Sequence, residues 1–272
     1  SNCDTNADGV LSEEEINAVK DMDVTYREIE SLEGIKYFTA MTKLDCYGND
    51  LTGLDLSGCT ALTRLECYSN QLSSLNVRDC TSLSTLICDD NKLTGLDVSS
   101  CSSLKELHCY WNQLRTLNVN DCKELTVLYC YGNKLTELNV SGCPKLEKLK
   151  CDSNSGDDYA MDELNAEGCE KLTTLDCDGN KLSTLNVARC TGLTFLKCSR
   201  NSLETLDLSG CPNLEELYCR ENPDMSALDV SVCPGLVRLE CGSTNLSSLD
   251  VSACTELDYL ECGNNKNLTE LN

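Results

Sequence analysis

Residues 104–122 read LKELHCYWNQLRTLNVNDC, and residues 125–143 repeat the pattern as LTVLYCYGNKLTELNVSGC. The shared block is LxxLxCxxNxLxxL(D/N)VxxC, with a period of 21 residues. Its LxC cysteine recurs eleven times, with one spacing of 26 and one of 22, at Cys46, Cys67, Cys88, Cys109, Cys130, Cys151, Cys177, Cys198, Cys219, Cys241 and Cys262. A fixed period of this length indicates a solenoid of stacked coils.

A second row of ten cysteines closes the blocks, so the two rows and Cys3 account for all 22 cysteines. Residues 19–40 form an earlier, degenerate coil. The sequence therefore predicts two parts: residues 1–18 as a loop and cap helix, and residues 19–272 as a solenoid of about twelve coils. The chain stops within a repeat, so we expect a truncated last coil and further protein downstream.

The block resembles the signature LxxLxLxxNxL of the leucine-rich-repeat superfamily, with Cys in the third apolar place. It is most similar to short-repeat secreted bacterial members with an LxC strand, and its first coil resembles the internalin-type repeat. The resemblance implies an α/β fold: a right-handed solenoid with short parallel strands on the concave face, a largely irregular convex face and a small helical N-terminal cap. Strand alternation independently places Leu107 and Cys109 on one side and Glu106, His108 and Tyr110 on the other.

An asparagine follows most LxC cysteines at a distance of three residues, where a buried amide can satisfy backbone groups freed by a turn. Thr244 interrupts this row, and Arg27 stands at its place in the first coil. Equivalent residues on adjacent strands lie about 4.8 Å apart with parallel Cα–Cβ bonds, so their Cβ atoms stay farther apart than the roughly 3.8 Å typical of a disulfide. We therefore expect the ladder cysteines to be buried thiols that pack as small hydrophobes.

Residues 4–15 read DTNADGVLSEEE and match the 12-residue calcium loop of an EF-hand. The expected ligands are the side chains of Asp4, Asn6, Asp8 and Glu15, the carbonyl of Val10, and Ser12 through water. Ser12, with Glu15 three residues later, also predicts the start of a helix that runs to about Met22. The alternative is a solvated acidic turn, because the entering helix of an EF-hand is missing from the sequence.

Outward positions beside each LxC segment carry seven of the ten tyrosines, and Trp111 and Phe195 join them by the same register. Exposed aromatic side chains are typical of contact surfaces. The expected ligand-binding residues are His108, Tyr110, Trp111, Tyr129, Tyr131, Tyr47 and Tyr68. The alternative is that tyrosine simply favours exposed strand positions.

Five extra residues between Cys151 and Cys177 predict a longer loop, which offers Asp157, Asp158 and Tyr159 for contact or serves only as a connection.

A formal net charge of −23 argues against nucleic acid and anionic membranes as partners, and no stretch is apolar enough for membrane insertion. With one histidine and no nucleophile elbow or phosphate loop, the sequence predicts a protein that is not an enzyme. We expect a monomeric, secreted or cell-surface adhesion scaffold that binds a protein, with calcium as its cofactor. The alternative is a carbohydrate-binding or targeting segment of a larger surface enzyme.

Overall fold

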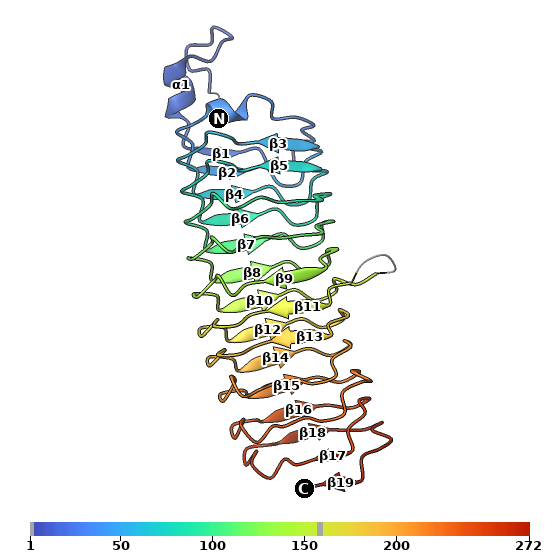
Figure 1. The fold of residues 1–272 in the computed structure, drawn as a ribbon. Coiled ribbons are helices and arrows are strands. Elements are labelled where there is room, and N and C mark those ends of the chain that lie inside the picture. The colour runs from blue at the N-terminus through green and yellow to red at the C-terminus, as the bar shows by residue number, and fades with distance from the viewer. Residues whose placement is uncertain (1–2, 157–159) are drawn as a thin grey trace. The chain divides into compact units, whose positions relative to one another are not determined.

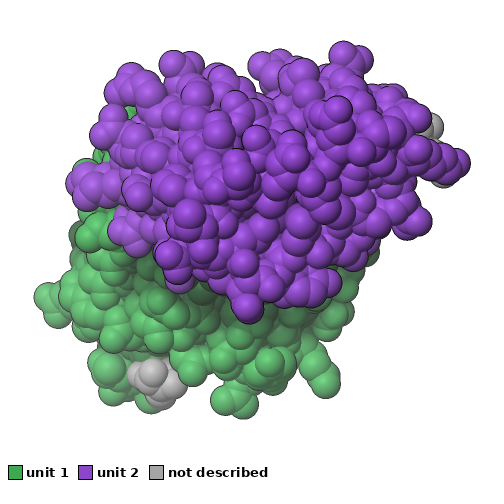
Figure 2. Space-filling view, turned by 90° about the horizontal axis from the view of Figure 1, so that it is seen from below, with its two compact units in different colours: residues 1–125 green, residues 126–272 purple. Residues whose placement is uncertain are grey.

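The computed structural model describes residues 3–156 and 160–272 (Figure 1). The chain divides into two compact units, residues 1–125 and 126–272, which Figure 2 colours separately. The boundary expected at residue 18 lies inside the first unit, and the separation of a cap from the solenoid stays a prediction. Each unit is a run of coils in which every coil adds one short parallel strand to a main sheet, as the repeat predicted.

In the first unit the main sheet contains β1 (Asp21–Asp23), β2 (Lys43–Asp45), β4 (Arg64–Glu66), β6 (Thr85–Ile87) and β7 (Glu106–His108). In the second it contains β8 (Val127–Tyr129), β10 (Lys148–Lys150), β12 (Thr174–Asp176), β14 (Phe195–Lys197), β15 (Glu216–Tyr218), β16 (Arg238–Glu240) and β18 (Tyr259–Glu261). The register pairs the leucine of each strand with that of its neighbour, as in Leu44 with Leu65 and Leu175 with Leu196. Identical side chains therefore form continuous rows.

A second set of short parallel strands lies in the L(D/N)V segments, on a side that the sequence led us to expect as largely irregular. The first unit has β3 (Gly53–Asp55) paired with β5 (Ser74–Asn76), and the second has β9 (Glu137–Asn139), β11 (Glu163–Asn165), β13 (Thr184–Asn186), β17 (Ser248–Leu249) and β19 (Glu270–Leu271). Their leucines and valines repeat every 21 residues as regularly as those of the main strands. The constant period holds these segments in hydrogen-bonding register.

The core consists of the aliphatic and cysteine rows, which the repeat stacks without interruption. Leu44, Cys46, Leu65 and Cys67 are all fully buried. Inward-facing leucine and cysteine therefore confirm the alternation predicted for the LxC strand.

Buried asparagines join each coil to the one before it. The Asn70 side-chain Nδ2 donates to the carbonyls of Cys67 and Tyr68 in its own coil and of Cys46 in the preceding coil. Its Oδ1 accepts the backbone N–H of Leu51 at 3.1 Å. These bonds confirm the structural role predicted for the asparagine row.

The turns at Thr244 and Arg27, which lack the asparagine, also have side-chain hydrogen bonds to their backbone. The Thr244 hydroxyl donates to the carbonyl of Cys241 at 2.9 Å, and Asn49 Oδ1 accepts the backbone N–H groups of Arg27 and Ile29 in the first coil.

The N-terminal helix α1 (Glu13–Ala18) begins at the predicted cap, because the Ser12 hydroxyl accepts the backbone N–H of Glu15 and Glu15 bonds back to Ser12. The expected extension to Met22 is wrong. Val19 adopts an extended backbone, and Met22 lies in β1, where it faces Leu44 of the next strand. The hydrogen bonds of the sheet outweigh the helix propensity of this segment.

A 3₁₀ turn, η1 (Ile35–Tyr37), completes the helical content that the structure describes. No helix among these residues is long and apolar enough to cross a membrane. The loop residues Asp157, Asp158 and Tyr159, which were considered as contact residues, lie outside the described residues.

The ladder cysteines are buried except for Cys262, which is only partly buried, and the neighbours Cys46 and Cys67 are free thiols, as the strand geometry predicted. Burial raises the pKa of Cys46 and of Cys80 to about 12 and that of Cys101 to about 11. A thiol reacts through its thiolate, so these groups are inert at neutral pH while the protein stays folded.

We expect alkylation of native protein at pH 8 to modify Cys262, which is only partly buried, before any cysteine of the core. The core thiols should react only after denaturant exposes them, because folding both covers them and raises their pKa. Intact-mass spectrometry under iodoacetamide, with and without urea, measures this directly. A disulfide between Cys46 and Cys67 in native protein would contradict the packing argument.

Candidate functional site

The outward residues of the main strands, together with the two residues that follow each ladder cysteine, form a surface that we call the strand face. In β7, Leu107 is fully buried, whereas Glu106 and His108 are partly exposed. Because successive side chains of a strand point to opposite faces and the leucine faces the core, these outward positions have no role in core packing. They are free to differ from coil to coil.

Three tyrosines make a continuous aromatic row at the start of this face. The Tyr47 and Tyr68 rings stack with centroids 4.3 Å apart and planes 9° apart, and Tyr26 meets Tyr47 edge-on at 5.3 Å. Burial, with a hydrogen bond between the Tyr68 and Tyr47 side chains that favours the protonated phenol, raises the pKa of Tyr68. Tyr47 and Tyr68 therefore lie on adjacent coils of the strand face with their rings stacked.

His108, Tyr110 and Trp111 lie together at the end of the first unit. Ring centroids are 6.2 Å apart between His108 and Tyr110, and 5.3 Å apart between Tyr110 and Trp111. Trp111 is 59% exposed and adopts a φ of 50°. It therefore lies on the tight turn after the strand and not in the strand register from which it was predicted.

Tyr129 and Tyr131 lie in the second unit, on and just after β8, and both are partly buried. The Lys150 ammonium is 5.5 Å from the centroid of the Tyr129 ring. The five-residue patch predicted from the sequence therefore draws on both units, and its assembly as one site stays a prediction.

A further aromatic cluster in the second unit surrounds an arginine. The Arg238 guanidinium lies 3.9 Å from the Tyr259 ring centroid and 5.5 Å from that of Tyr218. Its Nε and Nη2 donate to Glu240 Oε1 at 3.0 and 2.6 Å. Phe195 extends the cluster with its ring 5.4 Å from Tyr218. Arg238 was not singled out from the sequence, although the strand register, which follows from the repeat, pairs Arg238 directly with Tyr259.

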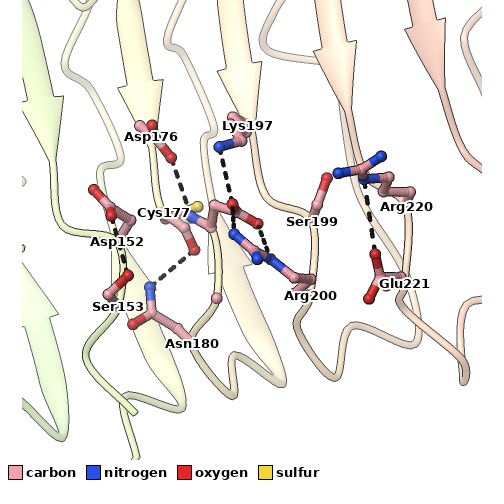
Figure 3. Close-up of polar contacts among 12 residues, drawn as sticks. Asp152, Ser153, Asp176, Cys177, Asn180, Lys197, Ser199, Arg200, Arg220 and Glu221 are labelled. Carbon is pink, nitrogen blue, oxygen red and sulfur yellow. Dashed lines mark hydrogen bonds and ion pairs between the residues drawn. The ribbon is translucent and has the colours of Figure 1, made fainter.

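Charged residues occupy the strand face between the two aromatic regions of the second unit. Lys197 and Arg200, both labelled in Figure 3, form ion pairs with Asp178, which is 3% exposed. Burial alone would raise the pKa of Asp178, but its hydrogen bonds and charge interactions with the two cations outweigh burial and lower it. Asp178 is therefore a stably ionised centre of this network.

Two neighbouring carboxyl groups have the opposite character. Burial raises the pKa of Asp176, and burial with repulsion from Asp176 raises that of Asp152 (Figure 3). Both groups are ionised at pH 7 only at a cost in free energy, which is recovered as the pH falls through the raised pKa.

At the N-terminus, residues 4–15 fold into a loop closed by Glu15. Glu15 Oε1 accepts the backbone N–H of Thr5 at 2.6 Å, and Asp4 Oδ2 accepts that of Gly9 at 2.9 Å. Gly9 has a φ of 84°, which supplies the sharp turn. Hydrogen bonds from Ser12 and Thr5 lower the pKa of Glu15 to about 2, so its carboxylate is ionised.

The side-chain oxygens of this loop accept backbone N–H groups of the loop itself. Asp8 and Asn6 side-chain oxygens accept the N–H groups of Val10 and Asp8, both at 2.9 Å. Over residues 3–156 and 160–272, no three Asp, Glu, His or Cys side chains already form a group that could hold a metal ion. Calcium would need the Asn6 amide and the Val10 carbonyl as well as the three carboxylates.

No protein-family model and no curated protein matches this sequence. Among solved structures, the functional domain of InlJ from Listeria monocytogenes, which includes a cysteine ladder, is 36% identical with a TM-score of 0.81. The match covers 96% of this chain and 57% of the InlJ chain, so the present chain spans little more than half of that structure.

More distant solenoids also match. The leucine-rich-repeat protein LIC12759 of Leptospira interrogans is 19% identical with a TM-score of 0.63, over 95% of this chain and 85% of that one. The plant peptide hormone receptor RGFR1, in complex with RGF2, is 20% identical with a TM-score of 0.72, over 96% and 48%. The fold is therefore the leucine-rich-repeat solenoid, and its cysteine rows are similar to the ladder of InlJ.

The charged network predicts that replacing two aspartates of one coil has opposite effects on the free energy of unfolding. Asp178→Asn should lower the free energy of unfolding at pH 7 by about 2 kcal/mol, because Lys197 and Arg200 lose the buried charge they share. Asp176→Asn, the matched control, should leave it unchanged or raise it, since it removes a charge that burial disfavours. Urea unfolding measures both.

The pH dependence gives a second check. The contribution of Asp178 is present above the ordinary carboxyl pKa and is lost as the pH falls through its lowered value. The gap between wild type and Asp178→Asn should therefore begin to narrow below about pH 4 and close only as the pH falls through the lowered pKa. An equal loss of stability in both variants at pH 7 would show that the network is not what distinguishes them.

Proposed function

We propose that this chain is a non-catalytic extracellular binding and adhesion scaffold that presents the aromatic part of its strand face to a protein partner. The observation that carries the proposal is the row of ordered aromatic rings on outward positions, from Tyr47 and Tyr68 to Tyr110 and Trp111. Rings held against each other lose little conformational entropy when a partner covers them. Elsewhere the strand face carries the Tyr218 and Tyr259 cluster around Arg238 and charged groups such as Asp178 with Lys197.

The solved relatives support a protein as the partner class. The RGFR1 structure is that of a peptide hormone receptor in complex with RGF2, and its solenoid covers nearly all of the present chain in the comparison. The similarity to a functional domain of InlJ supports a bacterial internalin-like role. A surface location follows from the same resemblance, and a glycan is the other ligand class that exposed aromatic rings suit.

We further propose that residues 4–15 bind one calcium ion. Asp4, Asn6, Asp8 and Glu15 would hold it through side-chain oxygens, Val10 through its carbonyl, and Ser12 through water. The ion supplies positive charge at a loop whose carboxylates now accept backbone N–H groups. Leu11 and Ile16, beside the loop, line an apolar groove with Met22 and Phe38 of the first coil. Calcium would thereby stabilise the N-terminal end of the first unit.

Isothermal titration calorimetry with calcium tests this second proposal. We expect one site in wild-type protein and in Glu14→Gln, and weak or no binding in Glu15→Gln, because Gln keeps the helix cap but removes the bidentate charge. Calcium should raise the melting temperature of wild-type protein and of Glu14→Gln but not that of Glu15→Gln, because a ligand that binds the folded state stabilises it. Absence of heat at millimolar calcium, with an unchanged melting temperature, would refute the site.

The aromatic assignment predicts which substitutions weaken partner binding. Trp111→Ala and Tyr129→Ala should each cost about 2 kcal/mol, or roughly thirtyfold in affinity, because truncation of a buried aromatic anchor removes contact area and packing. Lys43→Ala should change affinity far less, since Lys43 already pairs with Asp45 at 2.6 Å. Candidates come from arrays of extracellular proteins and glycans, and affinities from surface plasmon resonance at fixed calcium.

Asn76→Ala changes a residue of the second set of strands and is the control that tests whether the partner binds the strand face at all. If this change abolishes binding while both aromatic variants bind normally, the partner uses another surface. Binding to glycans alone would favour the carbohydrate alternative.

A further inference from the structure

One acid interrupts the tyrosine row of the first unit. The residues that directly follow the ladder cysteines of four successive coils are Tyr47, Tyr68, Asp89 and Tyr110. Backbone hydrogen bonds place Asp89 between the two tyrosines: Ser69 N donates to Asp89 O, and Asp90 N donates to Tyr110 O, both at 3.1 Å. The short carboxyl side chain therefore has a longer tyrosine side chain on each flank.

The carboxyl group of Asp89 is buried without a cation of its own. Asp89 is 5% exposed, and its buried Oδ1 has no hydrogen-bond partner. The Tyr110 side chain is hydrogen-bonded to the same carboxyl group, and burial raises the pKa of Asp89. A buried ionised carboxylate without full pairing is costly, so this group favours an incoming positive charge.

Three other buried acids of the strand face differ in this respect. Asp45 pairs with Lys43, Asp178 with Lys197 and Arg200, and Glu240 with Arg238. No ion pair joins Asp89 to a lysine or arginine of the described residues. Asp89 thus has the surroundings of a buried ion pair but no lysine or arginine partner; the charge of His108 also acts on it, while His108 itself lies 3.1 Å from Glu106.

The second unit shows the completed arrangement. There the Arg238 guanidinium lies between the Tyr218 and Tyr259 rings while it donates two hydrogen bonds to Glu240. Tyr68 and Tyr110 likewise belong to the two coils on either side of Asp89. Adjacent strands are about 4.8 Å apart, so roughly 10 Å separates the two tyrosine backbones, which leaves room for one flat group between the rings.

We propose that Asp89, flanked by Tyr68 and Tyr110, receives an arginine side chain of the protein partner. Tyr110 gives up its hydrogen bond and turns aside, the guanidinium donates to the Asp89 carboxylate, and the two rings contact its faces. Arginine fits better than lysine because its planar, forked donors match a carboxylate and stack on aromatic rings. The net charge of −23 favours a basic partner as well. The inference deepens the proposed function and depends on it.

Trp111 fluorescence reports on this site directly. Trp111 is the only tryptophan of the sequence, and its ring centroid lies 5.3 Å from that of Tyr110. The probe is N-acetyl-arginine amide, with the neutral isostere N-acetyl-citrulline amide and N-acetyl-lysine amide as comparisons. The variants are Asp89→Asn and its neighbour Asp90→Asn, which is exposed and loses the same charge. Circular dichroism checks that both fold, and removal of a costly buried charge should leave Asp89→Asn folded.

We expect saturable quenching of Trp111 fluorescence by the arginine probe in wild type and in Asp90→Asn, at millimolar concentrations. Binding should be about tenfold weaker in Asp89→Asn, because a charge-assisted hydrogen bond is lost. Citrulline should bind far more weakly than arginine, and lysine more weakly too. Equal loss in the two variants, equal binding of citrulline or lysine, or no saturable change at tens of millimolar would each overturn the proposal.

The full-length partner separates this inference from the proposed function. If Trp111→Ala weakens partner binding while Asp89→Asn binds as well as Asp90→Asn, the arginine site is wrong and the aromatic surface stands. If Trp111→Ala, Tyr129→Ala and Asp89→Asn all bind normally, the proposed function itself fails. A selective loss in Asp89→Asn supports both.

Discussion

The side-chain amide of the buried asparagine is the interaction on which each coil depends. A chain that must turn back every 21 residues exposes backbone groups at the turn, and burial of such groups without partners is costly. Asn70 resolves this by bonding to its own coil through Cys67 and to the preceding coil through Cys46 and Leu51. The same residue therefore closes one turn and fixes its spacing to the next.

This constraint explains why cysteine is suited to its rows. The residue three positions before each asparagine lies where the turn begins, fully buried beside the amide, as Cys67 does. A small apolar side chain fits there, and the strand spacing keeps neighbouring sulfurs from forming disulfides. The strongly raised pKa of such thiols also makes them unreactive at neutral pH. The buried ladder cysteines therefore contribute to core packing and do not take part in thiol chemistry while the protein is folded.

Because the core rows are so uniform, the strand face carries the differences between coils. The buried acids on this face have different surroundings: Asp178 is held between two cations, whereas Asp89 lies among tyrosines. Ring stacking between Tyr47 and Tyr68 arises from the same one-strand spacing that aligns the leucines. Because the scaffold is regular, a single residue difference between two coils changes the charge and the contacts at one place on the strand face.

The sequence by itself determined the period, the inward rows, the asparagine bonds and the helix cap at Ser12, because each depends on contacts that repeat every 21 residues or lie within one turn. It did not determine the second set of strands or the end of α1, which depend on hydrogen bonds between coils. Trp111 was placed on the correct side but in the wrong local conformation, since its positive φ is set by the turn. Only the tertiary structure distinguished Asp89 from Asp178, because burial and ion pairing depend on side chains that neighbouring coils bring together.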